Sequence, residues 1–350
     1  MQGLGGAIRG CISLGLLWFL LHSPGVVLAE QAANGSTAPP PMHAGTLEDW
    51  TALSLVGSDL RPDQPISGEK DDFPLFTREL IRVKWRRGDP INLYLILPKG
   101  VVKPPVILYL YSYPSETDRF RDNDYCVRLT RDGYAAVGFV SALTGHRYAN
   151  RPMKEWFVSE LQESLVTSVH DVQMILNFLS TRDDFDLNRV GMFGTGSGGT
   201  IAILAAAADP RIKAIDVLDP WGDWPVWMAS SSIIPENERP NYVKPEFLNK
   251  VAGLDPIDWL PKLKLQHMRV EQVLDDEVTP KAARDRIAAA APAAAQVVKY
   301  EGMGQFFGAA SGGRLFQWIK ESVRSPEQQP PPRAQKSAPS VALIEPGHDD

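Results

Sequence analysis

The feature that most constrains the fold of this sequence is a glycine-rich stretch between an apolar run and a run of small residues. Residues 189–200 read R-V-G-M-F-G-T-G-S-G-G-T. The apolar residues 190–193 are typical of a buried strand, and the small residues 197–208 predict a helix that packs closely on a sheet. Glycine suits a sharp turn between them, because it adopts backbone angles that cost other residues energy. The segment therefore predicts a strand, a tight turn and a helix.

The rest of the chain continues this alternation. Two short alternating runs, 80–85 and 91–97, predict a β-hairpin. Apolar runs predict further strands, and amphipathic or small-residue runs predict the helices between them. The expected strands are 106–111, 135–140, 190–193, 214–218, 270–274 and 296–300, and the expected helices are 118–131, 159–179, 197–208, 281–291 and 313–323. This order indicates an α/β fold with a mainly parallel sheet, an N-terminal hairpin and helices on both faces.

Residues 220–263 interrupt the alternation after the sixth expected strand. They carry several prolines and four tryptophans, with no clear period. Ligand clefts of parallel sheets lie beyond the carboxyl ends of the strands. We therefore expect a cap-like, aromatic-rich insertion over such a cleft, with Trp221, Trp224 and Trp227 in contact with a ligand. The alternative role of these tryptophans is to fill a core.

Both ends of the chain differ in composition from its middle. Residues 1–29 combine one arginine, a short apolar run and small residues before Glu30, which is the pattern of a cleaved secretory signal. The apolar run is shorter than the ~20 residues that a membrane span needs. We therefore expect a secreted or periplasmic protein without a stable membrane span; an uncleaved anchor is the alternative. Residues 30–72 predict a loosely ordered lead-in, 73–324 the folded domain and 325–350 a disordered, proline-rich tail.

Charge and cysteine content exclude several classes of function. A formal net charge of −6 gives no basis for binding nucleic acid. Once residues 1–29 are removed, Cys126 is the only cysteine, which excludes an internal disulfide and a cysteine-based structural zinc site. We expect neither a metal ion nor an organic cofactor, and as partner a small-molecule or peptide ligand.

In its order of elements and in three motifs the chain resembles the α/β-hydrolase family, especially its esterases and dienelactone-hydrolase-like members. The motifs are R-V-G-M-F-G-T-G-S-G-G at 189–199, D-D-E-V-T-P at 275–280 and Y-E-G-M-G-Q-F-F at 300–307. The nucleophile, acid and histidine of that family follow one another along the chain in this order. The resemblance, which covers about residues 75–323, implies that Gly196 stands at the nucleophile position, Asp276 at the acid position and Gln305 at the histidine position.

Two of these three positions lack the chemistry of a triad. Gly196 has no side chain that can attack, and the amide of Gln305 does not titrate at neutral pH. The glycine turn between strand and helix is retained. The resemblance implies that the Ser197 amide and residues Tyr111, Ser112 and Tyr113 form the former oxyanion site, which can hold an anion. We therefore expect a pseudo-hydrolase that binds a small molecule, sugar or peptide in the former active-site cleft.

Besides a purely structural role, two alternatives remain open at this point. In the first, an active esterase uses displaced chemistry, with Ser197 as nucleophile, Asp276 as acid and His146 as base. In the second, Gly194 to Gly199 match the pattern G-x-G-x-x-G, and Asp219 follows 20 residues after Gly199, which is the spacing of a dinucleotide-binding site.

Overall fold

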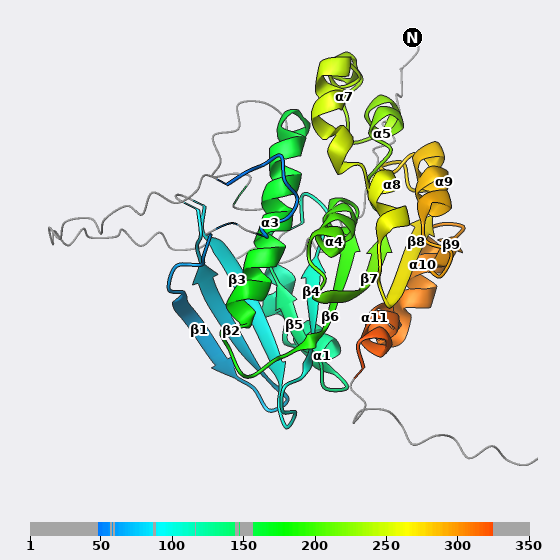
Figure 1. Cartoon of the computed structure of the whole chain (residues 1–350). Coiled ribbons are helices and arrows are strands. Elements are labelled where there is room, and N and C mark those ends of the chain that lie inside the picture. Colours follow the sequence, from blue (N-terminus) through cyan, green and yellow to red (C-terminus); the bar gives the residue numbers. More distant parts are fainter. Residues whose placement is uncertain are drawn as a thin grey trace, which may run out of the picture.

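The computed structural model describes residues 48–324, except 57, 59, 87–88, 116, 144–146 and 148–156. Within these residues, nine strands form one sheet in the order β1-β2-β3-β5-β4-β6-β7-β8-β9 (Figure 1). The strands are β1 (Ile66–Asp72), β2 (Phe76–Val83), β3 (Ile91–Pro98), β4 (Pro105–Leu110), β5 (Ala135–Gly138), β6 (Asp186–Thr195), β7 (Ile212–Leu218), β8 (His267–Val273) and β9 (Gln296–Tyr300). The expected signal at 1–29, the tail at 325–350 and His146 lie outside the described residues.

The sheet is mainly parallel, as the alternation of strands and helices predicts. β2 and β3 form the expected hairpin, and β3 pairs antiparallel with β5. From β5 through β4, β6, β7 and β8 to β9, every pairing is parallel. The predicted α/β class is therefore confirmed.

Helices cover both faces of the sheet (Figure 1). α3 (Leu161–Leu179), α4 (Ser197–Ala208) and α9 (Lys281–Ala290) pack on one face, and α1 (Asn123–Thr130) and α11 (Gln317–Ser322) on the other. Along β4, Val106 and Leu108 join the first core whereas Ile107 and Tyr109 join the second. Successive strand side chains point to opposite faces. The unbroken apolar run of β4 thus reflects a strand that is buried on both sides.

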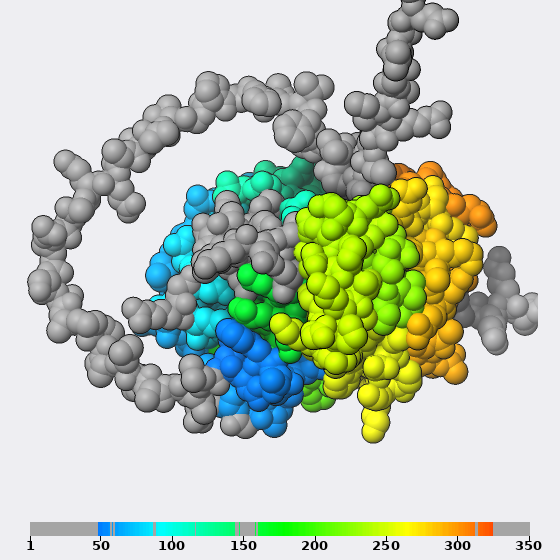
Figure 2. Space-filling model, turned by 90° about the horizontal axis from the view of Figure 1, so that it is seen from above, coloured from blue at the N-terminus to red at the C-terminus, as the bar shows by residue number. Residues whose placement is uncertain are grey.

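The insertion follows β7. This is the sixth of the expected strands, and it becomes the seventh because the structure adds β1, which was not predicted. It holds the short helices α5 (Trp224–Ser230), α6 (Arg239–Tyr242), α7 (Pro245–Val251) and α8 (Pro256–Trp259). Seen from above, its yellow-green surface covers the middle of the molecule beside the blue residues at the described N-terminal end (Figure 2). Its buried side chains belong to the same core as α3 and α4, so the insertion is an extension of the domain core.

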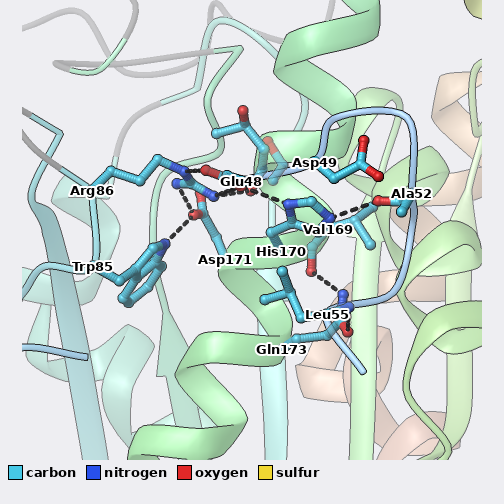
Figure 3. A network of polar contacts seen from close by, with 12 residues as sticks. Glu48, Asp49, Ala52, Leu55, Trp85, Arg86, Val169, His170, Asp171 and Gln173 are labelled. Atoms are coloured by element: carbon cyan, nitrogen blue, oxygen red, sulfur yellow. Dashed lines mark hydrogen bonds and ion pairs between the residues drawn. The ribbon is translucent and has the colours of Figure 1, made fainter. Parts of the chain in front are cut away.

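The described part of the lead-in is more ordered than its composition suggests. β1 pairs antiparallel with β2. Six of its seven residues are exposed, so its sequence lacks the apolar alternation that would predict a strand. Upstream of β1, residues 48–55 lie along α3 (Figure 3). The His170 ring lies between the Glu48 carboxylate and the Ala52 carbonyl oxygen, at 2.5 and 2.8 Å, and the Leu55 amide donates to Gln173 at 2.9 Å.

A buried ion network extends these contacts. The Arg86 guanidinium donates to Glu48 and to Asp171 of α3, and Arg147 binds the second oxygen of Asp171. Asp171 is fully buried and also accepts from the Trp85 indole at 3.1 Å. A buried charge is stable only when it is paired in this way. The network therefore joins the lead-in, the β2–β3 segment and α3.

The C-terminal part contains one helix that the sequence did not predict. α10 (Met303–Ala310) precedes α11, and its two glycines make it a weak helix former by propensity. The remaining elements are the 3₁₀ turns η1 (Asp118–Arg121), η2 (Phe157–Glu160), η3 (Ala252–Leu254), η4 (Leu260–Lys262) and η5 (Ser311–Phe316). None of the helices in the described ranges combines the length and hydropathy needed to cross a membrane.

Candidate functional site

A cavity of about 500 Å³ lies where four neighbouring parallel strands end. The registers pair Leu110 with Gly194, Thr195 with Leu218, and Leu218 with Glu271, so the strands stop at one edge of the sheet. The residues that follow them meet there, which is where open parallel sheets place their ligand sites. The wall of the cavity is formed by Tyr111, Ser112, Tyr113, Pro114, Ser115, Arg119, Phe193, Thr195, Gly196, Leu218, Asp219, Trp221, Ile233, Asp276, Val278, Phe306, Phe307 and Leu315.

The turn between β6 and α4 has the tight geometry that its glycines predict. Gly196 has φ +50° and ψ −120°, angles that L side chains rarely adopt. A Cβ at Gly194 would lie 2.4 Å from the carbonyl oxygen of Gly198, and a Cβ at Gly198 would lie 2.2 Å from that of Leu110. These glycines thus allow α4 to approach the ends of β4 and β6. Their hydrogen atoms face protein backbone, which does not favour a dinucleotide in this turn.

The space beside Gly196, where a nucleophile's side chain would begin, is filled by Ser112. A Cβ at Gly196 would lie 2.3 Å from Ser112 Oγ, 2.8 Å from Ser112 Cβ and 3.1 Å from the Trp221 Nε1. Real Cβ atoms essentially never approach another heavy atom within 3.0 Å. The wall of the cavity is therefore built around a glycine at this position.

The amides that were expected to form an oxyanion site already have partners. The Ser197 amide donates to Ser112 Oγ at 3.4 Å, and the Tyr113 amide donates to Ser197 Oγ at 3.0 Å. Ser197 is fully buried and is not part of the cavity wall. This arrangement does not favour Ser197 as a displaced nucleophile, because its hydroxyl accepts from a backbone amide inside the protein. The expected anion site at these amides is occupied by serine hydroxyls in the same way.

Asp276, at the acid position, lies in the wall of the cavity in the loop after β8. Its carboxylate accepts hydrogen bonds from the amides of Val278, at 3.3 Å, and Thr279, at 2.9 Å. Burial raises the pKa of Asp276, and these two amides partly counteract that effect.

A second carboxyl group, Asp219, lies in the same wall at the end of β7. It has φ +43°, is 6% exposed, and accepts from the Val273 amide at 3.1 Å. Burial raises the pKa of Asp219 well above its usual range, and the nearby Asp276 carboxylate raises it further. The sequence drew attention to Asp219 only as part of a dinucleotide pattern. A sequence signal that could have placed Asp219 in the cavity wall is its position directly after the parallel strand β7.

The residue predicted at the histidine position lies outside the cavity wall. Gln305 is exposed at the start of α10, and its side-chain oxygen accepts from the Glu301 amide at 2.5 Å. The next residue, Phe306, is buried and lines the cavity instead. Gln305, which the resemblance puts at the histidine position, does not line the cavity, because its side chain turns back to the Glu301 amide just before α10.

In the part of the chain that the structure describes, no histidine belongs to the cavity wall. His170 is held in the network with Glu48, and His267 begins β8, at the strand end away from the cavity. The Tyr111 hydroxyl, which faces the second core, bonds to Tyr125. Among the described residues, no histidine therefore lies close to Asp276.

The three tryptophans of the insertion are divided between the cavity and the core. Trp221 lines the cavity, whereas Trp224 and Trp227 do not and are 1% and 0% exposed. The Trp227 ring packs against Trp221 at 4.8 Å and against Trp224 at 5.8 Å between ring centroids. Trp224 and Trp227 thus take the alternative role of filling the core behind the wall, whereas ligand contact by Trp221 stays a prediction.

Three further wall residues had no signal that singled them out in the sequence. Phe193 lies near the end of β6, Phe306 belongs to α10, and the Arg119 guanidinium lies 3.6 Å from the centroid of the Tyr111 ring. Isolated aromatic and basic residues of this kind are usually structural, so only their position at the strand ends identifies them. Across the described ranges, no group of three or more His, Cys, Asp or Glu side chains is placed to hold a metal ion.

Comparisons with known proteins find similarity in structure only. No protein-family model and no curated protein sequence matches the chain. Acetyl xylan esterase 1 from Thermoanaerobacterium sp. JW/SL YS485 superposes with a TM-score of 0.62 and 15% identity, over 79% of this chain and 92% of the esterase. An acetyl xylan esterase from Paenibacillus sp. R4 gives 0.62 and 18%, over 78% and 92%.

A cold-adapted esterase from an Arctic intertidal metagenomic library is also similar. Its TM-score is 0.53 at 11% identity, and the match covers 74% of this chain and all of the esterase. At such identities, the likeness establishes a common fold and leaves the chemistry to be argued from the residues of the site.

Proposed function

We propose that this chain, which has the α/β-hydrolase fold, is a binding protein that has lost the catalytic chemistry of that fold. One observation carries the proposal: Ser112 and Trp221 occupy the space into which a side chain at position 196 would project. A nucleophile at this turn would require Ser112 to move and the Trp221 ring to give way by a few tenths of an ångström. A ligand in the cavity would therefore rest against the wall that Ser112 and Trp221 form beside Gly196.

The surroundings of Gly196 support the same reading. The Ser197 amide, which would stabilise a developing oxyanion, donates to Ser112 Oγ. The Asp276 carboxylate accepts hydrogen bonds from two amides of its own loop. In the segment predicted to carry the catalytic histidine, the residue that lines the cavity is Phe306, which cannot act as a base. A triad without nucleophile and base retains little of its rate advantage.

The aromatic wall favours a small apolar or aromatic ligand. Tyr111, Phe193, Trp221 and Phe306 all line the cavity, whose volume of about 500 Å³ is within the range of small-molecule sites. Two similar structures are named acetyl xylan esterases, so acetylated xylo-oligosaccharides are a second class of ligand to be tried.

The proposal is tested by measuring turnover and binding on the same preparation. With 4-nitrophenyl acetate, we expect the wild-type protein and Ser197→Ala to hydrolyse no faster than the heat-denatured protein. Titration with aromatic small molecules is expected to change the fluorescence of Trp221 in a saturable manner. Saturable hydrolysis that Ser197→Ala abolishes would overturn the proposal.

We also propose that residues 1–29 direct the protein out of the cytoplasm, on the basis of their composition. The mature protein is then expected to begin at Glu30. N-terminal sequencing of protein recovered from the periplasm or medium checks this cleavage. Recovery of an uncleaved chain from the membrane fraction would support the alternative of an anchor.

A further inference from the structure

We propose that the cavity binds an organic ammonium ion, meaning a protonated amine carried on an aromatic or branched apolar body. This inference rests on the proposed binding function and specifies its ligand class. It depends on where the charged groups of the wall lie and on what they already contact.

Two carboxyl groups of the wall, those of Asp219 and Asp276, have no direct contact with a cationic side chain among the described residues; the Arg284 guanidinium acts on both only through space. Asp219 accepts only the Val273 amide, and Asp276 accepts only the amides of its own loop. Within the described part of the chain, neither carboxyl group forms an ion pair. The Arg284 guanidinium nearby donates instead to the carbonyl oxygens of Leu274, Asp276 and Thr279. Since a carboxylate offers about four acceptor sites, both groups retain capacity for a donor from a ligand.

The burial of these groups makes an external cation favourable. Removing carboxylates from water is costly unless an opposite charge approaches them. The raised pKa values of Asp219 and Asp276 express that cost. An ammonium group beside them would supply three hydrogen-bond donors and a positive charge in direct contact, which the Arg284 guanidinium does not provide.

The sheet order separates the two ends of such a ligand. In the order β4-β6-β7-β8, Gly196 follows β6, whereas Asp219 and Asp276 follow β7 and β8. Arg119, the cationic residue of the wall, follows β4 on the other side of Gly196 and lies over the Tyr111 ring. The ammonium group therefore belongs on the β7–β8 side, and the apolar body extends toward Tyr111.

The remainder of the wall suits a cation better than an anion. Aromatic faces such as those of Trp221 and Phe306 attract organic cations as well as apolar groups. The backbone amides that would otherwise hold an anion already donate to Ser112 and Ser197. These two observations do not involve the carboxyl groups, and both also favour a cationic ligand.

The test compares three probes of similar shape by isothermal titration at pH 7.5: 2-phenylethylamine, 2-phenylethanol and 3-phenylpropionate. We expect the amine to bind at least about tenfold more tightly than the alcohol, a difference equal to about 1.4 kcal/mol. The propionate is expected not to bind measurably.

Two variants identify the charge that is responsible. Asp276→Asn removes the charge but keeps an acceptor for only one of the Val278 and Thr279 amides, because these amides donate to different carboxylate oxygens. It should remove most of the preference for the amine. The matched control is Asp275→Asn, which removes the same charge from an exposed residue outside the cavity wall. The unfolding midpoint of each variant verifies that it is folded.

The preference should also depend on pH. The charged groups around Asp276 are Asp219, Asp275 and Arg284, with Glu271 beside Asp219 and Arg119 across the cavity. Because burial raises the pKa of Asp276, amine binding should weaken on acidification already above the usual range of a carboxyl group, whereas alcohol binding should not change.

The outcomes separate this inference from the proposed function. Equal affinities for the amine and the alcohol would overturn the inference and leave a binding protein. Failure of the amine to bind, or an equal loss of amine binding in Asp275→Asn and Asp276→Asn, would also overturn it. Only catalytic turnover would count against the proposed function itself.

Discussion

Replacing Gly196 by alanine is expected to destabilise the protein by about 2–6 kcal/mol. Two costs add at this position. Backbone angles of φ +50° and ψ −120° are strained for a residue with a Cβ, at about 1–3 kcal/mol. The new Cβ would also lie 2.3 Å from Ser112 Oγ and 3.1 Å from the Trp221 Nε1, and overpacking of this kind costs about 1–3 kcal/mol.

Two other glycines provide matched controls for the two costs. Gly100 has φ +77° but nothing within 4 Å of its Cβ position, so Gly100→Ala measures the backbone cost alone. Gly304, in α10, has neither a positive φ nor a neighbour within 4 Å. We expect Gly304→Ala to be neutral or to stabilise the protein by up to about 1 kcal/mol.

The assay is equilibrium unfolding in urea, followed by tryptophan fluorescence, with the midpoint and the slope both fitted. Adding Ser112→Gly to Gly196→Ala removes both Ser112 atoms that the Cβ would meet. This double variant should recover about 1–3 kcal/mol relative to the sum of the single changes. The reasoning is refuted if Gly196→Ala costs no more than Gly100→Ala, or if the two substitutions are additive.

Three further predictions concern catalysis, the core and the lead-in. Gly196→Ser alone should not hydrolyse 4-nitrophenyl acetate above the wild-type background, because no histidine among the described residues lines the cavity; measurable turnover would mean that another base reaches the turn. Trp227→Ala should cost about 3–5 kcal/mol in urea unfolding, since the ring is fully buried, and a loss below about 1 kcal/mol would contradict its place in the core. Burial opposes the charge of Glu48, but hydrogen bonds from His170 and Arg86 outweigh it and lower its pKa from 4.5 to about 2. Because the folded pKa lies below the unfolded one, this contribution is complete above pH 4.5 and is lost as the pH falls toward 2; Glu48→Gln should reduce the pH dependence in that window, and an unchanged profile would refute the assignment.

Much of the fold could be predicted because its signals are local. The turn at Gly196 and the small-residue helix after it are encoded within about a dozen consecutive residues, and strands buried on both faces appear as unbroken apolar runs. β1 escaped prediction for the opposite reason: nearly all of its residues are exposed, and only its pairing with β2 makes it a strand. The glycines of α10 likewise conceal a helix that the packing of Phe306 supports.

The sequence by itself determined the α/β class, the glycine turn after β6 and the carboxyl group after β8, since each depends on neighbouring residues. Tertiary structure alone decided what the site contains. Ser112 meets Ser197 across 85 positions of the chain, and the Val273 amide meets Asp219 across 54. It also assigned Trp221 to the cavity but Trp227 to the core. Contacts of this kind arise only when separate strands end at one edge of the sheet, and no local pattern of residue types records which side chain then occupies the space.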